Sequence, residues 1–103
     1  MSSPLTRSKK ALEKDGYHVE KTEHFNSWAK VRIDLWGFCD LLAIRENEIL
    51  AVQTTSASNM SARVKKILGH DNYAKVKAAG IKVRVDGWKK NKKGRYEIKI
   101  REL

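Results

Sequence analysis

Two aspartates and a glutamine are the residues whose types and spacing could do chemistry in this chain. Asp40 directly precedes one apolar run, and Gln53 directly follows the next one. Asp34 and Asp40 bracket an apolar segment around Gly37, where a bend or bulge is expected. Carboxylates beside apolar segments are costly to bury unless they are paired or bind a cation. Both aspartates are therefore candidate cation ligands, although Asp34 could instead cap a turn.

The elements that must position these residues are two short strands joined by a polar turn. Residues 41–44 and 49–52 are apolar, and residues 45–48 between them are polar, which predicts a hairpin of buried strands. Because a strand places residues two apart on one face, Gln53 and Thr55 should point the same way. An acid and a polar pair are thus expected at the rim of an apolar sheet.

The charge of the chain favours a polyanionic partner. Lys and Arg number 22 against 12 Asp and Glu, which gives a net charge of +10. Clustered cations at such a charge are typical of nucleic-acid binding, and a merely soluble basic protein is the alternative. Lysines in a turn repel one another unless a phosphate backbone passes over them. The candidate nucleic-acid-binding residues are Lys65, Lys66, Lys89, Lys90, Lys92, Lys93 and Arg95.

Composition excludes several classes of protein. A length of 103 residues suits a single domain, residues 1–103, with one core. The lone Cys39 excludes an intrachain disulfide and a zinc site made of cysteines. No apolar run approaches the ~18 residues of a membrane span, and the N-terminus lacks a signal-peptide pattern. We therefore expect a cytoplasmic protein with no membrane partner.

The rest of the chain alternates between helical and strand patterns. A helix is expected from Pro4 to just before Gly16, and an edge strand over residues 17–21. Met60, Val64, Ile67 and Leu68 have helical spacing, and a second short helix should follow up to Gly80. Residues 81–86 and 95–101 alternate as strands, and residues 87–94 read as a basic loop between them.

The aromatic residues leave alternatives open. Residues 24–28 read as a loop, in which His24 and Trp28 could contact a nucleotide by a hydrogen bond and by stacking. A surface histidine and a core tryptophan are the favoured interpretation. Trp88 could likewise stack on a base, but a core role is favoured. The apolar Leu35–Trp36 segment is either core or the interface of a homodimer.

The order of elements resembles the αβββαβ core of the PD-(D/E)XK, or restriction-endonuclease-like, nucleases. The local resemblance is to the small archaeal and phage Holliday-junction resolvases. Asp40 stands for the acid that opens a strand in that family, Gln53 for its Glu and Thr55 for its Lys. The resemblance covers Pro4 to Val85, and its specific part covers Asp40 to Ser56. It implies an α/β fold with a mixed central sheet flanked by helices, here with a C-terminal basic hairpin.

The resemblance also implies a metal set. In that family the acids hold Mg²⁺ or Mn²⁺, which stabilises charge on the phosphate and activates water. Applied here, the ligands would be Asp40, Asp34, the side-chain oxygen of Gln53 and the backbone carbonyl of Thr54.

Two features of this chain depart from the family. Gln53 is neutral, and Thr55 cannot replace an ammonium group. Arg63, or otherwise Lys66 or Lys65, would supply the missing cation as a phosphate clamp, since Arg stays protonated. The resolvases also carry an acid on the first helix, and Leu5 to Ser8 here contains none.

The expected function is metal-dependent hydrolysis of DNA phosphodiester bonds, with a structure-selective preference for branched DNA. The first alternative is a non-catalytic DNA- or RNA-binding module on the same fold, which the neutral Gln53 and the missing Lys favour. The second is a protein whose basic surface binds an acidic partner. Steep loss of DNA affinity with salt would argue against that last alternative.

Overall fold

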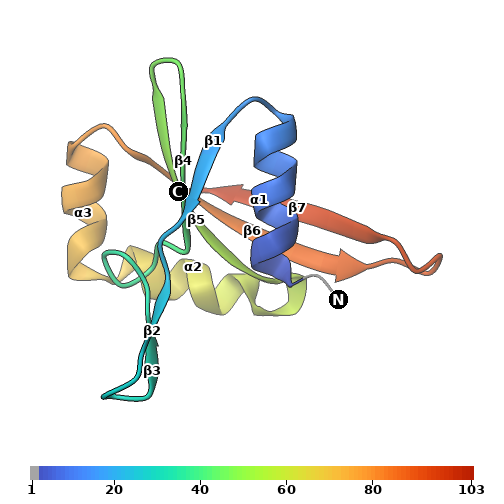
Figure 1. Cartoon of the computed structure of the whole chain (residues 1–103), viewed down its shortest axis with the longest axis horizontal. Coiled ribbons are helices and arrows are strands. Elements are labelled where there is room, and N and C mark those ends of the chain that lie inside the picture. Colours follow the sequence, from blue (N-terminus) through green and yellow to red (C-terminus); the bar gives the residue numbers. More distant parts are fainter. Residues whose placement is uncertain (1–2) are drawn as a thin grey trace.

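A five-stranded mixed sheet with helices on both faces makes up most of the molecule (Figure 1). The computed structural model describes residues 3–103. The helical elements are α1 (Pro4–Lys14), η1 (Ala57–Asn59), α2 (Met60–Leu68) and α3 (Asp71–Ala78). In spatial order the sheet contains β1 (His18–Lys21), β4 (Leu41–Arg45), β5 (Glu48–Ser56), β6 (Lys82–Lys90) and β7 (Tyr96–Glu102). A separate two-stranded sheet contains β2 (His24–Asn26) and β3 (Val31–Ile33).

The strand connections explain why the sheet is mixed. β4 and β5 form the expected hairpin, whose turn places Asn47 at φ 61°, a conformation that Asn tolerates. β5 and β6 are parallel, and the crossover that a parallel pair requires is made by α2 and α3. The remaining pairs of the sheet are antiparallel. The predicted α/β class with a mixed sheet flanked by helices is confirmed.

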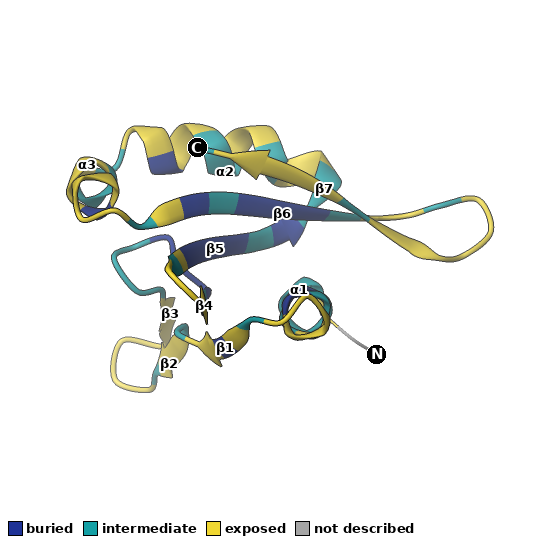
Figure 2. Cartoon of the chain, turned by 90° about the horizontal axis from the view of Figure 1, so that it is seen from above, coloured by how far each residue is buried: buried dark blue, intermediate teal, exposed yellow. Residues whose placement is uncertain are grey.

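The core lies in two layers, one on each face of the sheet. Leu50 and Val52 of β5 pack with Leu12 of α1 on one face. Ala51, between them, belongs to the opposite cluster with Ile67 of α2. Figure 2 shows α1 on one side of β5 and β6, and α2 with α3 on the other. Since β5 is covered on both faces, its residues 49–52 are apolar throughout rather than alternating.

A buried polar network holds α1 on the sheet. The hydroxyl of Ser8 donates to Asp86 Oδ2 at 2.8 Å, and both residues are completely buried. Arg84 donates to the same carboxylate from Nε at 2.6 Å and from Nη2 at 3.0 Å. The indole N–H of Trp88 donates to the Ser8 oxygen at 2.9 Å. The buried charge of Asp86 is therefore paired, and it fixes where the N-terminus of α1 lies.

Several sequence predictions are confirmed in detail, and others need correction. The helix from Met60 to Leu68 is present as predicted. Residues 24–28 are not simply a loop, since β2 pairs there with β3. The core interpretation of Trp28 is wrong, because its side chain is 96% exposed on a hairpin that no opposing layer covers. Within residues 3–103, no helix combines the length and the apolar character needed to cross a bilayer.

The predicted basic loop over residues 87–94 is shorter than expected. β6 continues through Lys90, where it pairs with Tyr96 of β7. Gly87 is buried within the strand because the side chain of Met60 occupies the space that a Cβ would need. Trp88 is half-buried and lines a groove with Ser56 and Lys89, so both interpretations of its role stay predictions. Leu35 and Trp36, also half-buried, pack against the cluster around Phe38.

The buried network generates a stability prediction. Asp86→Ala should lower the free energy of unfolding by about 3–5 kcal/mol, because it leaves the guanidinium of Arg84 buried and unpaired. Glu13→Ala is the matched control, since it removes a carboxylate from the exposed ion pair with Lys9. That control should cost less than about 0.5 kcal/mol. Urea unfolding measures both variants, and equal losses would contradict the assignment.

Candidate active site

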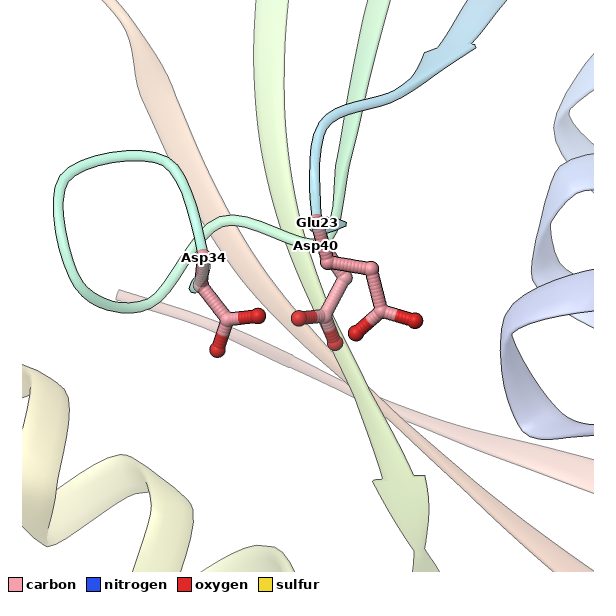
Figure 3. A group of neighbouring side chains, drawn as sticks. All are labelled: Glu23, Asp34 and Asp40. Atoms are coloured by element: carbon pink, nitrogen blue, oxygen red, sulfur yellow. The ribbon is translucent and has the colours of Figure 1, made fainter. Parts of the chain in front are cut away.

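Three carboxylates from separate parts of the chain meet at one end of the sheet (Figure 3). Ligand oxygens of Glu23, Asp34 and Asp40 all lie within 4.8 Å of one another. Asp40 is buried, with 3% of its surface exposed, and the other two acids are half-buried. The predicted meeting of Asp34 and Asp40 is therefore observed, and Glu23 joins them.

Backbone pairing places Glu23 beside Asp40. The N–H of Thr22 donates to the Asp40 carbonyl at 2.8 Å, which extends the antiparallel pairing of β1 with β4. On its other side, the Asp40 N–H donates to the carbonyl of Val52 in β5 at 2.9 Å. Asp40 is thus fixed between two neighbouring strands, and the next residue after Thr22 lies at its side.

A tight turn places Asp34 opposite Asp40. Leu35 and Cys39 exchange two backbone hydrogen bonds, of 3.1 and 2.8 Å, and so form a bridge. The chain reverses between them through Trp36 at φ 58° and Gly37 at φ 87°. The residues just outside such a bridge are cross-strand neighbours, so Asp34 and Asp40 come close. A Cβ at Gly37 would also collide with His70, which makes glycine necessary there twice over.

Neutral donors from β5 surround the Asp40 carboxylate. Gln53 Nε2 donates to Oδ2 at 2.6 Å, and the Thr54 backbone N–H donates to the same atom at 2.8 Å. The Thr54 hydroxyl adds a third bond at 3.1 Å. Thr54 therefore contributes donors, and the ligand role of its carbonyl oxygen stays a prediction.

The environment raises the pKa of Asp40 to about 7. Burial is the main cause, since it penalises the charged form, and the nearby carboxylates of Asp34 and Glu23 add to it. The backbone N–H of Thr54 acts in the opposite direction by stabilising the carboxylate. Arg32 Nη1 lies 3.6 Å from Glu23 Oε1 and so offsets one of the three negative charges. A proton or a bound cation would relieve the repulsion that remains between Asp34 and Asp40.

The side chain of Gln53 provides an independent sign of a missing ligand. It is 3% exposed, and its Oε1 has no hydrogen-bond partner. A buried polar atom without a partner is costly, and native proteins rarely leave one. Its amide nitrogen already contacts Asp40, so the amide group lies at the acid cluster. Carboxylate and amide oxygens are the ligands that Mg²⁺ and Mn²⁺ prefer, so these residues fit such an ion.

A cavity of about 630 Å³ opens in front of the acid cluster. The three acids, Gln53 and residues 54–56 form one part of its wall, and residues 3–6 at the start of α1 form another. Cationic side chains also line it, from β1, β3 and α2; they are Lys21, Arg32, Arg63 and Lys66. An acidic floor with a basic rim suits a phosphate group that meets a cation.

The structure brings together most of the predicted site residues and separates the rest. The cavity wall contains the predicted residues Asp34, Asp40, Gln53, Thr54, Thr55, Arg63 and Lys66. Lys65 lines a different groove on α2, with Met60 and Ile100, so it does not reach the acids. Lys89 lies in a shallow groove with Ser56, while the other predicted binding residues are exposed at the β6–β7 turn. Those residues are Lys90, Lys92, Lys93 and Arg95.

Glu23 is the site residue that sequence reasoning missed. It supplies the third carboxylate that the first helix lacks, although it comes from the segment after β1. The available signal was the antiparallel pairing of the edge strand with the strand that Asp40 opens. That pairing places the end of the first strand beside the start of the second.

Cys39, although next to Asp40, is unsuited to act as a nucleophile. Its thiol is fully buried and donates to the Leu41 carbonyl at 3.1 Å. Burial raises its pKa to about 11, so the reactive thiolate is disfavoured.

Comparisons with protein-family models, curated proteins and solved structures find no match for this chain.

The cluster generates a pH prediction for the metal-free protein. Since the pKa of folded Asp40 is about 7 and its ordinary value is 3.8, the folded state holds the proton longer. This contribution to stability is full below about pH 4 and is lost as the pH rises through 7. Relative to Asp40→Asn, the wild type should lose about 3 kcal/mol between pH 5 and pH 8 in EDTA. Urea unfolding across that range measures this, and parallel curves for the two proteins would contradict it.

Proposed function

We propose that the chain is a divalent-cation-dependent endonuclease that hydrolyses phosphodiester bonds in DNA. The observation that carries this proposal is the meeting of Glu23, Asp34 and Asp40 beside an unpartnered Gln53 oxygen, in a cavity with a basic rim. The element order supports a restriction-endonuclease-like fold. α1 precedes three antiparallel strands, β1, β4 and β5, and a crossover leads to the parallel β6.

The chain's own residues divide into cation ligands and phosphate contacts. Glu23, Asp34, Asp40 and Gln53 would hold Mg²⁺ or Mn²⁺. When bound, such an ion stabilises charge on the phosphate and lowers the pKa of water. Arg63 and Lys66 of α2 would orient the phosphate from across the cavity. Thr55 stands at the position of the Lys in the family that the chain resembles. Arg63 and Lys66 would therefore supply the positive charge that this Lys provides there.

The exposed lysines of the β6–β7 hairpin extend this surface to the nucleic-acid backbone. Ser56 at the end of β5 pairs with Trp88 of β6, and the basic residues follow directly after Trp88. The hairpin therefore begins beside the end of β5, the strand that carries Gln53. Contacts of this kind give affinity without sequence preference, because each releases counterions from the phosphates.

The acid cluster generates the decisive test. The wild type should nick plasmid or branched DNA in Mg²⁺ or Mn²⁺, and Asp40→Ala should abolish nicking while binding in EDTA persists. Glu23→Gln should slow cleavage by at least about tenfold, because it removes one charged ligand. Glu20→Gln is the matched control in β1, the strand that precedes Glu23, because its carboxylate is exposed and pairs with His18 instead.

Either of two results would contradict the nuclease proposal. One is a wild type that binds DNA and never cuts it with either ion. The other is cleavage by Asp40→Ala at the wild-type rate. The first would support the second candidate function, a non-catalytic nucleic-acid-binding module, which the neutral Gln53 and the Thr at position 55 favour.

A pair of variants on α2 tests the phosphate clamp. Arg63→Ala should reduce the cleavage rate by about 10²-fold, in the range of lost electrostatic stabilisation at a reacting group. Lys65→Ala removes one charge from the same helix, but that residue lines the opposite groove, so its rate should change less than about threefold. Single-turnover cleavage at saturating enzyme separates the rate from binding. Equal effects of the two variants would mean that only net charge matters.

A further inference from the structure

The β2–β3 hairpin connects two of the candidate metal ligands. Glu23 directly precedes β2 and Asp34 directly follows β3, so both ends of the hairpin lie at the acid cluster. Its two strands belong to a separate sheet, and Figure 1 shows the hairpin extending away from the main sheet. Whatever the hairpin touches will therefore lie next to the cavity.

The hairpin exposes aromatic side chains that its surroundings do not use. Trp28 at the turn is 96% exposed and Phe25 is 61% exposed. An exposure of this size is unusual for such large apolar residues, and clusters of them mark binding surfaces. The turn itself is ordered by Asn26, whose Oδ1 accepts from the N–H groups of Trp28 at 3.0 Å and Ala29 at 3.2 Å. The indole is thus presented from a defined backbone.

The charge of the hairpin points to a nucleic-acid partner. Residues 24–33 contain Lys30 and Arg32 and no acidic residue. Arg32 pairs with Glu23, the residue before the hairpin, at 3.6 Å, but its side chain stays 75% exposed. Phe25 is the cross-strand partner of Arg32, so the two side chains share one face of the hairpin. Arg32 lines the cavity, and this face therefore continues the cavity wall. Aromatic rings beside cations, next to a phosphate-binding cavity, match single-stranded nucleic acid, whose bases stack while its phosphates pair with cations.

We infer that the β2–β3 hairpin binds unpaired bases of the DNA beside the bond to be cut, with Trp28 and Phe25 stacking on them and Lys30 and Arg32 holding the backbone. Bases within a continuous duplex are stacked on each other and offer no free face to these rings. The hairpin thus gives the protein a preference for DNA with unpaired bases, such as flaps, gaps and branch points. This inference rests on the proposed function of the adjacent cavity.

Binding in EDTA tests the hairpin without relying on cleavage. The probes are labelled oligo(dT), a fully paired duplex and the same duplex carrying a single-stranded flap. The wild type should bind the flap DNA and oligo(dT) more tightly than the duplex. Trp28→Ala should lose about tenfold or more on the two probes with unpaired bases, as expected for one lost stacking contact, and little on the duplex. Trp28→Phe keeps an aromatic ring and should retain most of the preference.

Tryptophan fluorescence provides a second readout. Stacking on a base should quench Trp28, so oligo(dT) should quench the wild type and not Trp28→Phe. Trp36→Phe is the matched control, because Trp36 is half-buried against the core and its loss should leave the quenching intact. Since Trp28 is almost fully exposed, its variants should show the wild-type urea midpoint.

Three results would overturn the inference. They are an unchanged preference in Trp28→Ala, quenching that survives in Trp28→Phe, and a wild-type dimer that Trp28→Ala converts to monomer, which would make the hairpin a contact between copies. The nuclease proposal can fail separately. If the protein never cuts DNA but Trp28 still selects unpaired bases, the nuclease proposal would be disproved and the inference about the hairpin would stand.

Discussion

The structure around the site depends on one constraint, the burial of the Asp40 carboxylate next to two other acids. Its backbone is paired on both sides, with Thr22 and with Val52, so the residue cannot move away from the sheet. Three neutral donor contacts from Gln53 and Thr54 offset part of the cost of burial. Because the remaining repulsion has to be relieved by a proton or a cation, the fold holds its acids in a state suited to binding a metal.

A comparison with the other buried aspartate shows that this arrangement is not the only way the fold accommodates an acid. Asp86 is completely buried, and the bidentate guanidinium of Arg84 neutralises it. That pair, with Ser8, attaches α1 to the sheet and so fixes the helix start that lines the cavity. The acid with a structural role has a cationic partner, whereas the hydrogen bonds to Asp40 come from neutral groups. Such a difference is expected between a scaffold and a ligand site.

In the proposed function, the β2–β3 hairpin would link the acid cluster to the choice of nucleic acid. Its ends carry Glu23 and Asp34, and its turn carries Trp28, so a contact at the turn could bias the position of two ligands. The cations that complete the cavity come from both sides, with Arg32 on the hairpin and Arg63 on α2. A phosphate held between them would lie over the acid cluster. In the proposed function, nucleic-acid binding and metal binding would therefore take place next to each other.

The local elements and the chemical character of the chain follow from the order of its amino acids. Apolar periodicity sets the helix from Met60 to Leu68 and the β4–β5 hairpin, because these patterns depend on residues near one another in the chain. The positive charge follows directly from the composition. The proximity of Asp40 and Gln53 could also be predicted, since adjacent antiparallel strands bring their ends together.

Which distant residues complete the site depends on how the strands pair and the helices pack in space. Glu23 lies beside Asp40 because β1 pairs with β4. Arg63 lines the cavity and Lys65 lines another groove, because α2 packs on the sheet with one particular face. Trp28 is exposed because its hairpin leaves the main sheet, although its residue type favours burial. Apolar character alone does not specify which layer, if any, will cover a segment. Local sequence patterns therefore could not predict where these residues lie in the folded protein.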